Sequence, residues 1–457
     1  MIRQLIVAAT LSAASSSAYA QVAVSSTSGG AAGDLSVASF DPDSAVSPIS
    51  IVQGAGVKVG EGTVLHPVVG IETGFVSNVF YTKNDPQAAG LLRLSAQIGT
   101  ASLNKQRLNS TDVPPNPEDT NAENSADHGL LQYETSVRLA YDQTLSSNGT
   151  ITDTSGLGIG ALFHGLVYPD GTVSFGIDEN YERLIRAANF ETSTNDNRDL
   201  NILRLTLHYQ PVGRSVSGYL YYQNTLDVFE ESQNTYPNRM DHRVGLHPVW
   251  RFLPETSLYA DASLGVITEV GTAMTAVTKS TSYPLVTHLG LATLLSLKTT
   301  ANIQVGYTNG FYSAGPSYSA PTFDVALAYR YSPLGRVGVS YDLTYADSVN
   351  ASFYRDHTFR AFVQQGFAPF VVVVAPELHF REYQGALPSL TGSTTRDDTL
   401  VAIVAGIHYN FRNWIAATVD YRLSLLSTDY RYTDQAGTTD DPSFVRHELL
   451  FGLRVAM

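Results

Sequence analysis

Apolar and polar residues alternate along most of the chain after about residue 63. The alternation is clearest where Tyr133, Val137 and Tyr141 fall on one side of an extended strand while Glu134 and Arg138 fall on the other. Successive side chains of a β-strand point to opposite faces of the sheet. The period of two therefore predicts strands with one apolar and one polar face, and residues 64–457 show no convincing amphipathic helix.

The alternation and the turn residues between its segments predict eighteen strands. The predicted spans are 64–77, 90–103, 129–143, 155–168, 172–185, 200–210, 214–228, 241–252, 257–270, 284–297, 301–312, 321–332, 335–348, 357–367, 370–384, 397–411, 413–428 and 443–457. The pattern is most broken in 241–252, 357–367 and 370–384.

The predicted connections alternate in length. Short turns such as Pro169-Asp170-Gly171 follow the even-numbered strands, and their residues favour tight turns. Longer polar loops follow odd-numbered strands, at 186–199, 229–240, 271–283, 385–396 and 429–442. This layout is typical of bacterial outer-membrane barrels, whose short turns lie on the periplasmic side. Both termini then fall on that side, and residues 104–128 break the rule as a long periplasmic insertion or an unrecognised hairpin.

The length of the strands separates a membrane barrel from a soluble β-sandwich or propeller. Soluble strands average about 5–6 residues, and the predicted strands are about twice as long. Tyr133 and Tyr141 lie eight residues apart on an apolar face, which corresponds to roughly 20 Å along the membrane normal and fits an aromatic girdle at each interface. We therefore expect an all-β fold: a single transmembrane antiparallel β-barrel of about eighteen strands with a short N-terminal periplasmic extension.

The composition agrees with a lipid-facing surface. Charged residues make up 15% of the 457 residues, against about 25% in an ordinary soluble domain. The chain holds 26 Tyr and 19 Phe and has no Cys, which excludes cysteine nucleophiles, thiolate zinc sites and iron–sulfur clusters. The formal net charge of −14 is not a signal for a binding partner, because much of it lies in the predicted outer loops, and we expect no nucleic-acid partner.

The N-terminal residues indicate export. Residues 1–20 have a positive start, a short apolar core and the cleavage pattern Ala18-Tyr19-Ala20, as a signal peptide does. Residues 21–62 are rich in Ser, Ala, Gly and Val and are expected to be a flexible periplasmic segment. The alternative is that they fold against a periplasmic partner or enter the lumen as a plug. Residues 63–457 form the predicted barrel.

Motifs for catalysis or cofactors are mostly missing from the sequence, so we expect no enzyme, no cofactor and no resident metal. The stretch Gly156 to Ala161 matches a loose nucleotide-binding pattern, but no helix follows to receive a phosphate. Three Asp-His dipeptides occur, Asp127-His128, Asp241-His242 and Asp356-His357. Neighbours on a strand face opposite sides, so none can form a hydrogen-bonded dyad within itself. Acidic loop pairs such as Asp440-Asp441 are solvated charge or, alternatively, cation ligands.

The inward face is expected to line an aqueous channel, which a barrel of 16–18 strands is wide enough to hold. The lumen-lining candidates are Glu72, Arg93, Glu134, Arg138, Asp178, Glu182, Arg204, His208, Asp324, Arg330, Asp342, Arg360, Arg422, Arg446 and Glu448. Charges of both signs are interspersed, which suits a neutral or weakly charged hydrated cargo better than a simple ion filter. Inward rings such as Tyr219, Tyr221 and Phe362 either pack the wall or offer stacking platforms for sugars.

The first predicted strands resemble a known family. Leu65-His66-Pro67, the stretch from Gly70 to Tyr81, and Leu91-Leu92-Arg93-Leu94 resemble the start of the β-barrel porin 2 family of outer-membrane proteins. Within that family, the eighteen-strand layout is similar to myxobacterial exopolysaccharide-secretion porins. The resemblance implies a barrel in outer-membrane lipid that carries a polysaccharide in its lumen and works with a separate periplasmic polysaccharide-export protein.

Three functions remain open from the sequence. The leading expectation is a porin that exports a secreted polysaccharide. The alternative is an uptake porin, general or substrate-selective, for small hydrophilic solutes. An outer-membrane barrel hydrolase with a site built from several strands is the third. The last strand keeps its alternation but ends in Met457, where such barrels usually end in an aromatic residue.

Overall fold

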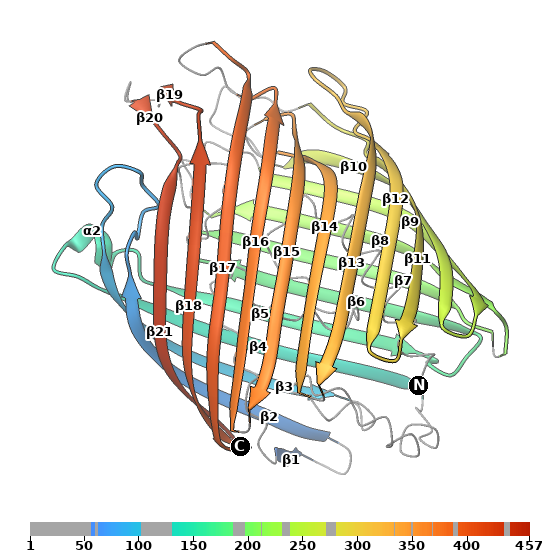
Figure 1. Cartoon of the computed structure of the whole chain (residues 1–457), viewed down its shortest axis with the longest axis horizontal. Coiled ribbons are helices and arrows are strands. Elements are labelled where there is room, and N and C mark those ends of the chain that lie inside the picture. Colours follow the sequence, from blue (N-terminus) through green and yellow to red (C-terminus); the bar gives the residue numbers. More distant parts are fainter. Residues whose placement is uncertain are drawn as a thin grey trace.

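The computed structural model describes residues 56–59, 63–101, 130–185, 197–211, 213–230, 238–270, 280–332, 334–348, 351–367, 369–386, 392–433 and 439–457. Each strand pairs antiparallel with its neighbour in the chain, and β2 also pairs with β21, so the sheet closes into an eighteen-stranded barrel (Figure 1). The barrel strands are β2 (Thr63–Val76), β3 (Ala89–Ala101), β4 (Leu131–Leu145), β5 (Gly156–Val167), β6 (Val173–Leu184), β7 (Arg198–Tyr209), β8 (Val216–Phe229), β9 (Asn238–Leu253), β10 (Thr256–Val270), β11 (Leu285–Ser296), β12 (Thr299–Asn309), β13 (Ser319–Ser332), β14 (Gly335–Asp347), β15 (Phe353–Phe367), β16 (Phe370–Gln384), β17 (Thr395–Arg412), β18 (Ile415–Thr428) and β21 (Phe444–Ala456). The predicted all-β barrel of eighteen strands is confirmed.

Two barrel strands start three or more residues before the predicted position. β9 begins at Asn238 and β15 at Phe353, whereas the pattern placed the starts at 241 and 357. Both strands extend further because cross-strand pairing continues past the broken part of the pattern: Arg239 pairs with Asp227, and Asp356 with Thr344. The extensions place Arg239 and Asp356, which lie outside the predicted strand spans, in the barrel wall.

The N-terminal segment contributes one short strand. β1 (Val57–Val59) pairs with the start of β2, with Val57 opposite Leu65. The signal peptide, the rest of residues 21–62 and the insertion 104–128 lie outside the described residues.

The two rims of the barrel differ. The tight turns, β1 and the C-terminal end of β21 lie at one rim, which we call the short-turn end (Figure 1). The other rim, the long-loop end, carries the helix α2 (Gly149–Thr152) and the hairpin β19 (Tyr432–Thr433) and β20 (Thr439–Asp440). In the described part of the chain, no helix is long and apolar enough to cross a membrane.

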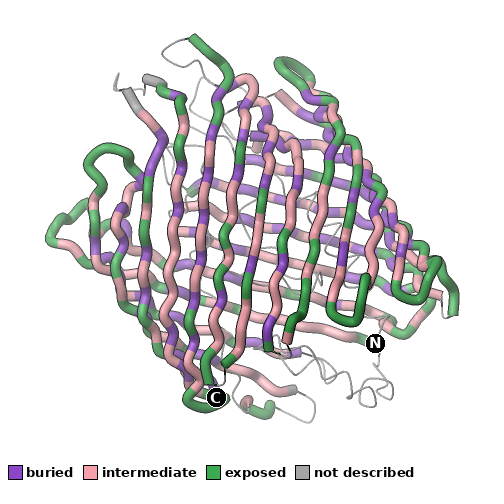
Figure 2. The backbone as a smooth tube through the Cα atoms, in the orientation of Figure 1, coloured by how far each residue is buried: buried purple, intermediate pink, exposed green. Residues whose placement is uncertain are grey.

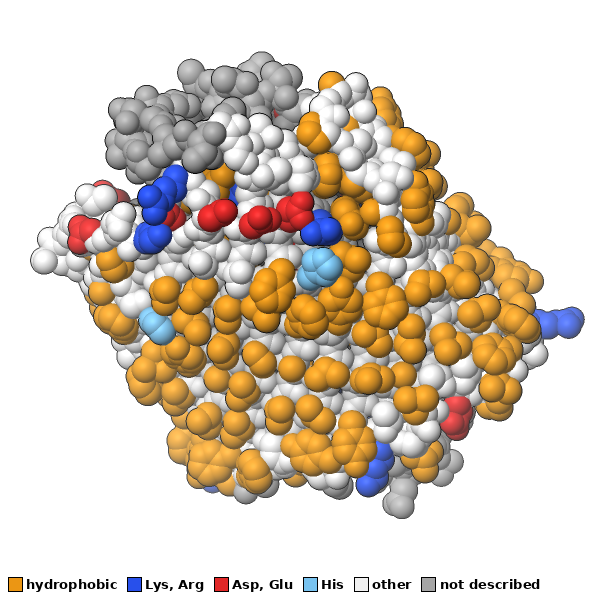
Figure 3. All heavy atoms as spheres, turned by 45° about the horizontal axis from the view of Figure 1, so that its top comes forward, with side chains coloured by type: hydrophobic (Ala, Val, Ile, Leu, Met, Phe, Trp, Pro, Cys, Tyr) orange, Lys and Arg blue, Asp and Glu red, His pale blue; other side chains and the backbone are white. Residues whose placement is uncertain are grey.

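Burial alternates along the strands in step with polarity (Figure 2). On β9, the outward Val244 and Leu246 are 53% and 51% exposed, whereas the inward Arg243 and His247 are 4% and 0% exposed. The buried face of this barrel is thus polar and its exposed face apolar, which is the reverse of a soluble protein. Hydrophobic side chains cover the outward surface, with a row of charged side chains above them (Figure 3).

The height of the apolar band matches a membrane. Phe252 follows His242 by ten residues on the outward face of β9, and Phe367 follows His357 by ten on β15. At about 3.3 Å per residue and a tilt near 40°, ten residues span about 25 Å, the height of the apolar band of outer-membrane barrels.

Candidate functional site

The polar inner wall is the candidate site. All fifteen lumen-lining candidates lie in barrel strands at positions of the inward-facing series, and their outward neighbours include exposed residues such as Leu94, Phe359 and Val445. Most are buried or half-buried against one another, and Arg330 is exposed near the short-turn end. Their part in transport remains a prediction.

The inward cations are arginines. In the described part of the chain, the lysines Lys58, Lys83 and Lys298 lie in β1, in an outer loop and in a short turn, away from the barrel wall. A guanidinium presents a rigid fork of donors and is less strongly hydrated than an ammonium, so it forms ion pairs more readily where water is limited. The wall can therefore hold many cations only if carboxylates lie beside them.

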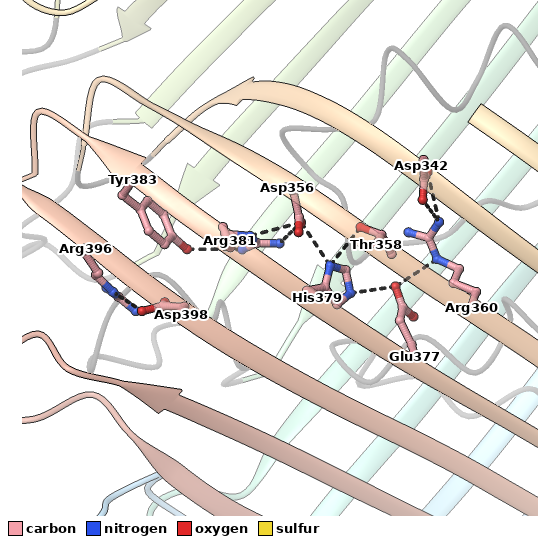
Figure 4. Close-up of polar contacts among 10 residues, drawn as sticks. All are labelled: Asp342, Asp356, Thr358, Arg360, Glu377, His379, Arg381, Tyr383, Arg396 and Asp398. Atoms are coloured by element: carbon pink, nitrogen blue, oxygen red, sulfur yellow. Dashed lines mark hydrogen bonds and ion pairs between the residues drawn. The ribbon is translucent and has the colours of Figure 1, made fainter. Parts of the chain in front are cut away.

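A continuous polar network runs along β14 to β17 (Figure 4). Arg360 on β15 joins Asp342 on β14, at 2.7 Å, to Glu377 on β16, at 2.9 Å. Arg381 holds Asp356 at 2.8 Å and donates to the hydroxyl of Tyr383 at 3.2 Å. The ion pairs join side chains of neighbouring strands, so the register of pairing determines which charged groups meet.

His379 lies at the centre of this network. Its Nδ1 is 2.9 Å from Asp356 Oδ2, and its Nε2 is 2.8 Å from Glu377 Oε1 (Figure 4). An imidazole with an acid at each nitrogen links the Arg360 cluster to the Arg381 cluster. The network continues where the guanidinium of Arg396 lies 4.8 Å from the ring centre of Tyr383.

A second network crosses the seam between the first and last strands. Arg454 on β21 binds Glu72 on β2 at 2.8 Å, and the exposed fractions of the two side chains are 1% and 0%. Arg93 on β3 binds Asp142 on β4 at 2.6 Å, and its Nη1 lies 3.8 Å from Glu72. Arg454 also lies 3.5 Å from Asp420 on β18. Ion pairs thus connect five strands, β18, β21, β2, β3 and β4, across the closure of the barrel.

Inward aromatic rings pack on glycines of the next strand. Tyr221 lies opposite Gly245, and a Cβ added to that glycine would be 2.2 Å from the tyrosine ring. Phe362 covers Gly338 in the same way, at 2.1 Å. Tyr219 stacks on His247, with ring centres 4.7 Å apart. These contacts support the packing role of the rings over a sugar platform, because their faces are occupied by the wall itself.

Strands β8 and β9, the end of β14 and the loop between β12 and β13 meet at the long-loop end. Arg239 on β9 binds Asp227 on β8 at 3.0 Å, and its other terminal nitrogen lies 3.5 Å from Asp347 at the end of β14. Tyr312, from the loop between β12 and β13, donates a hydrogen bond of 3.0 Å to Asp347. Burial, reinforced by the Asp347 carboxylate, raises the pKa of Tyr312 well above its usual value, so the hydroxyl stays protonated and remains a donor.

Several of these residues were not among the lumen-lining candidates predicted from the sequence. Arg239 and Asp356 lie just before the predicted starts of their strands, and His379 stands in a strand with a broken pattern. The alternation Arg239, Asp241, Arg243 on one face of β9 was the signal that could have found the first of them.

The Asp-His dipeptides separate as strand geometry requires. Asp241 and Asp356 point inward to arginines, whereas His242 and His357 lie on the outward face and contact Tyr222 and Tyr341. The dipeptide at 127–128 lies outside the described residues. Within the described residues, no group of three or more His, Asp or Glu side chains is arranged to hold a metal ion.

The comparisons with known proteins give fold similarity alone. No protein-family model and no curated protein matches the sequence. Among solved structures, Pseudomonas aeruginosa OpdQ is 9% identical with a TM-score of 0.44, covering 86% of this chain and 99% of its own. P. aeruginosa OccK2 (OpdF) in complex with glucuronate is 11% identical with a TM-score of 0.43, covering 86% and 98%. A triple mutant of Rhodopseudomonas blastica porin is 10% identical with a TM-score of 0.31, covering 86% and 100%.

The closed sheet, the apolar outward band and the charged inner wall define the class of the molecule. A closed barrel leaves no unpaired strand edge in lipid, and a polar lumen suits water. The chain has the fold of an outer-membrane β-barrel, and its apolar outward face suits contact with lipid.

Proposed function

We propose that the barrel is a diffusion channel for small hydrophilic solutes that are neutral or weakly charged. The observation that carries the proposal is the pairing of inward charge. The side chains of Arg93, Arg360 and Arg381 each lie within 3.0 Å of a carboxylate oxygen. A wall of paired charges attracts neither anions nor cations strongly, yet it offers hydrogen-bond donors and acceptors to a hydrated solute.

The contact at the long-loop end favours small solutes over a polymer. Arg239 and Asp347 come from strands that are not neighbours in the sheet, and Tyr312 adds a loop to the same contact. Side chains that approach each other across the rim reduce the width available to cargo. The proposed orientation places the short-turn end and both termini in the periplasm and the long-loop end at the cell surface.

Liposome swelling tests this function. Vesicles that contain the full-length barrel are diluted into isotonic solutions of neutral sugars, from a monosaccharide to a tetrasaccharide. We expect fast swelling with the monosaccharide and a steep fall with size. Equal rates for all four sugars, or none above protein-free vesicles, would contradict the proposal.

Export of a polysaccharide is the second candidate function, and the resemblance of residues 65–67, 70–81 and 91–94 to the β-barrel porin 2 family favours it. It requires the periplasmic polysaccharide-export partner that the family implies. A deletion strain that keeps normal surface polysaccharide, while the parent strain expresses the barrel, would exclude this function and leave the diffusion channel.

A further inference from the structure

The outward face carries the same pair of side chains three times. In each pair, a tyrosine hydroxyl lies 2.8–2.9 Å from Nδ1 of a histidine on the next strand, and the ring centres are 6.1–6.2 Å apart. The outer Tyr–His pairs are Tyr222–His242, Tyr341–His357 and Tyr421–His447.

The register of the three pairs is identical. Each histidine lies opposite the residue two positions after its tyrosine: His242 opposite Asn224, His357 opposite Leu343, and His447 opposite Leu423. The diagonal arrangement brings the ring nitrogen to the hydroxyl every time. Repetition at β8–β9, β14–β15 and β18–β21 distributes the pairs around the barrel.

The three pairs also share one depth. Each histidine is the fourth or fifth residue from the long-loop end of its strand. Below the histidines the outward surface is apolar, with Val244, Phe359 and Phe451 about half exposed. Figure 3 shows histidine side chains at the boundary between the hydrophobic band and the row of charged side chains. The pairs therefore lie at the membrane interface of the long-loop end.

The hydrogen bonds identify the free donor of the imidazole. At His242, both the Tyr222 hydroxyl, at 2.8 Å, and the Asn224 amide nitrogen, at 3.2 Å, approach Nδ1. An amide nitrogen only donates, so Nδ1 accepts and the ring proton is on Nε2. Within the described residues, Nε2 of His242, His357 and His447 has no hydrogen-bond partner. The Tyr222–His242 pair thus presents an N–H donor at the level of the lipid headgroups, and the other two pairs repeat its Tyr–His geometry.

We propose that the outer Tyr–His pairs bind the phosphate groups of a phosphorylated glycolipid in the outer leaflet. The inference rests on the proposed orientation, which places the long-loop end at the cell surface. A phosphate oxygen is the strongest acceptor at the interface, and its hydrogen bonds to N–H donors are charge-assisted. At one pair a cation is close in sequence: Arg355 lies two residues from His357 on the same face, with a side chain 43% exposed and paired with Glu382.

Retention of lipid A by the purified full-length barrel tests the proposal. The barrel is reconstituted with lipid A or with dephosphorylated lipid A, re-extracted, and its bound lipid measured by native mass spectrometry. We expect wild type to retain lipid A more strongly than dephosphorylated lipid A. In the triple variant His242→Phe, His357→Phe, His447→Phe, this preference should be roughly tenfold smaller. Equal retention by wild type and variant, or of both lipids by wild type, would overturn the proposal.

Two controls keep the result interpretable. The triple variant Tyr209→Phe, Tyr329→Phe, Tyr409→Phe changes outward tyrosines at the short-turn end and should retain lipid A as wild type does; an equal loss there would also overturn the proposal. If the histidine variant does not assemble, the variant Tyr222→Phe, Tyr341→Phe, Tyr421→Phe keeps the rings and should weaken the preference. Normal sugar permeation with lost lipid preference separates this site from the channel function.

Discussion

Arg239 and Asp347 lie 3.5 Å apart although four strands, β10 to β13, separate their strands in the sheet. The contact spans part of the rim at the long-loop end, and the Tyr312 hydroxyl donates a hydrogen bond to Asp347. Because the two residues belong to separated parts of the wall, their contact limits how far the rim opens. It is the feature that most directly relates the fold to the size of cargo.

Removing this contact should widen the mouth. In Asp347→Asn, the charge attraction to Arg239 is lost, and we expect higher single-channel conductance and faster swelling with the larger sugars. Asp227→Asn is the matched control, since Asp227 also pairs with Arg239 but lies on the adjacent strand. Equal changes in the two variants would show that charge alone, and not the contact across the rim, sets the conductance.

The pairing of charges in the wall predicts how ion selectivity responds to one lost cation. Arg360→Gln leaves Asp342 and Glu377 without their guanidinium, so the channel should become cation-selective. The reversal potential in a salt gradient measures the shift. Arg355→Gln removes the same charge from the outward face of β15 and should leave the reversal potential unchanged. A shift of similar size in this control would contradict the placement of Arg360 in the conducting path.

The seam between β2 and β21 depends on a buried ion pair. Glu72→Ala leaves Arg454 buried beside a smaller residue, and the loss should cost about 3–5 kcal/mol. Samples of each variant are heated to a series of temperatures before electrophoresis, and we expect the band of the folded barrel to disappear at a lower temperature in Glu72→Ala than in wild type. Glu382→Gln, in a more exposed pair, should cost less than about 1 kcal/mol. The exchange Glu72→Arg with Arg454→Glu should recover part of the loss if the pair itself is responsible.

Glycines opposite inward rings should tolerate no side chain. In Gly245→Ala, the new methyl group meets Tyr221, and we expect a destabilisation of about 1–3 kcal/mol. Adding Tyr221→Ala should restore part of the stability by making room. An additive loss in the double variant, measured by the same thermal assay, would show that the ring is not the obstacle.

The outer loops on either side of the seam are linked by Asp441, which binds Lys83 at 2.6 Å. Partial burial raises the pKa of Asp441, but hydrogen bonds from Lys83 and Ser443 outweigh it and hold the pKa below its usual value. The contribution of the Lys83–Asp441 ion pair to the stability of the fold is therefore present at neutral pH and is lost as pH falls through the lowered pKa of Asp441. Asp441→Asn should be less stable than wild type by under about 1 kcal/mol at pH 7. The difference should vanish at about pH 2, and its persistence there would contradict this origin.

The sequence predicted the barrel because alternation of period two is a local property that survives in almost every strand. It could not predict which inward charges meet. His379 lies between Asp356 and Glu377 only because β15 and β16 pair in one register, and a shift of two residues would keep the same pattern with different partners. The contact of Arg239 with Asp347 is further from prediction, because it depends on the shape of the closed barrel and on a loop rather than on pairing.

The central claim is that the barrel alone conducts weakly charged hydrated solutes through a charge-compensated lumen. Single-channel recording of the purified full-length barrel in a planar bilayer, with a tenfold potassium chloride gradient, tests it most directly. We predict stepwise conductance without any added partner and a reversal potential near zero. No conductance without a periplasmic partner, or a reversal potential close to the value for a perfectly cation- or anion-selective pore, would contradict it.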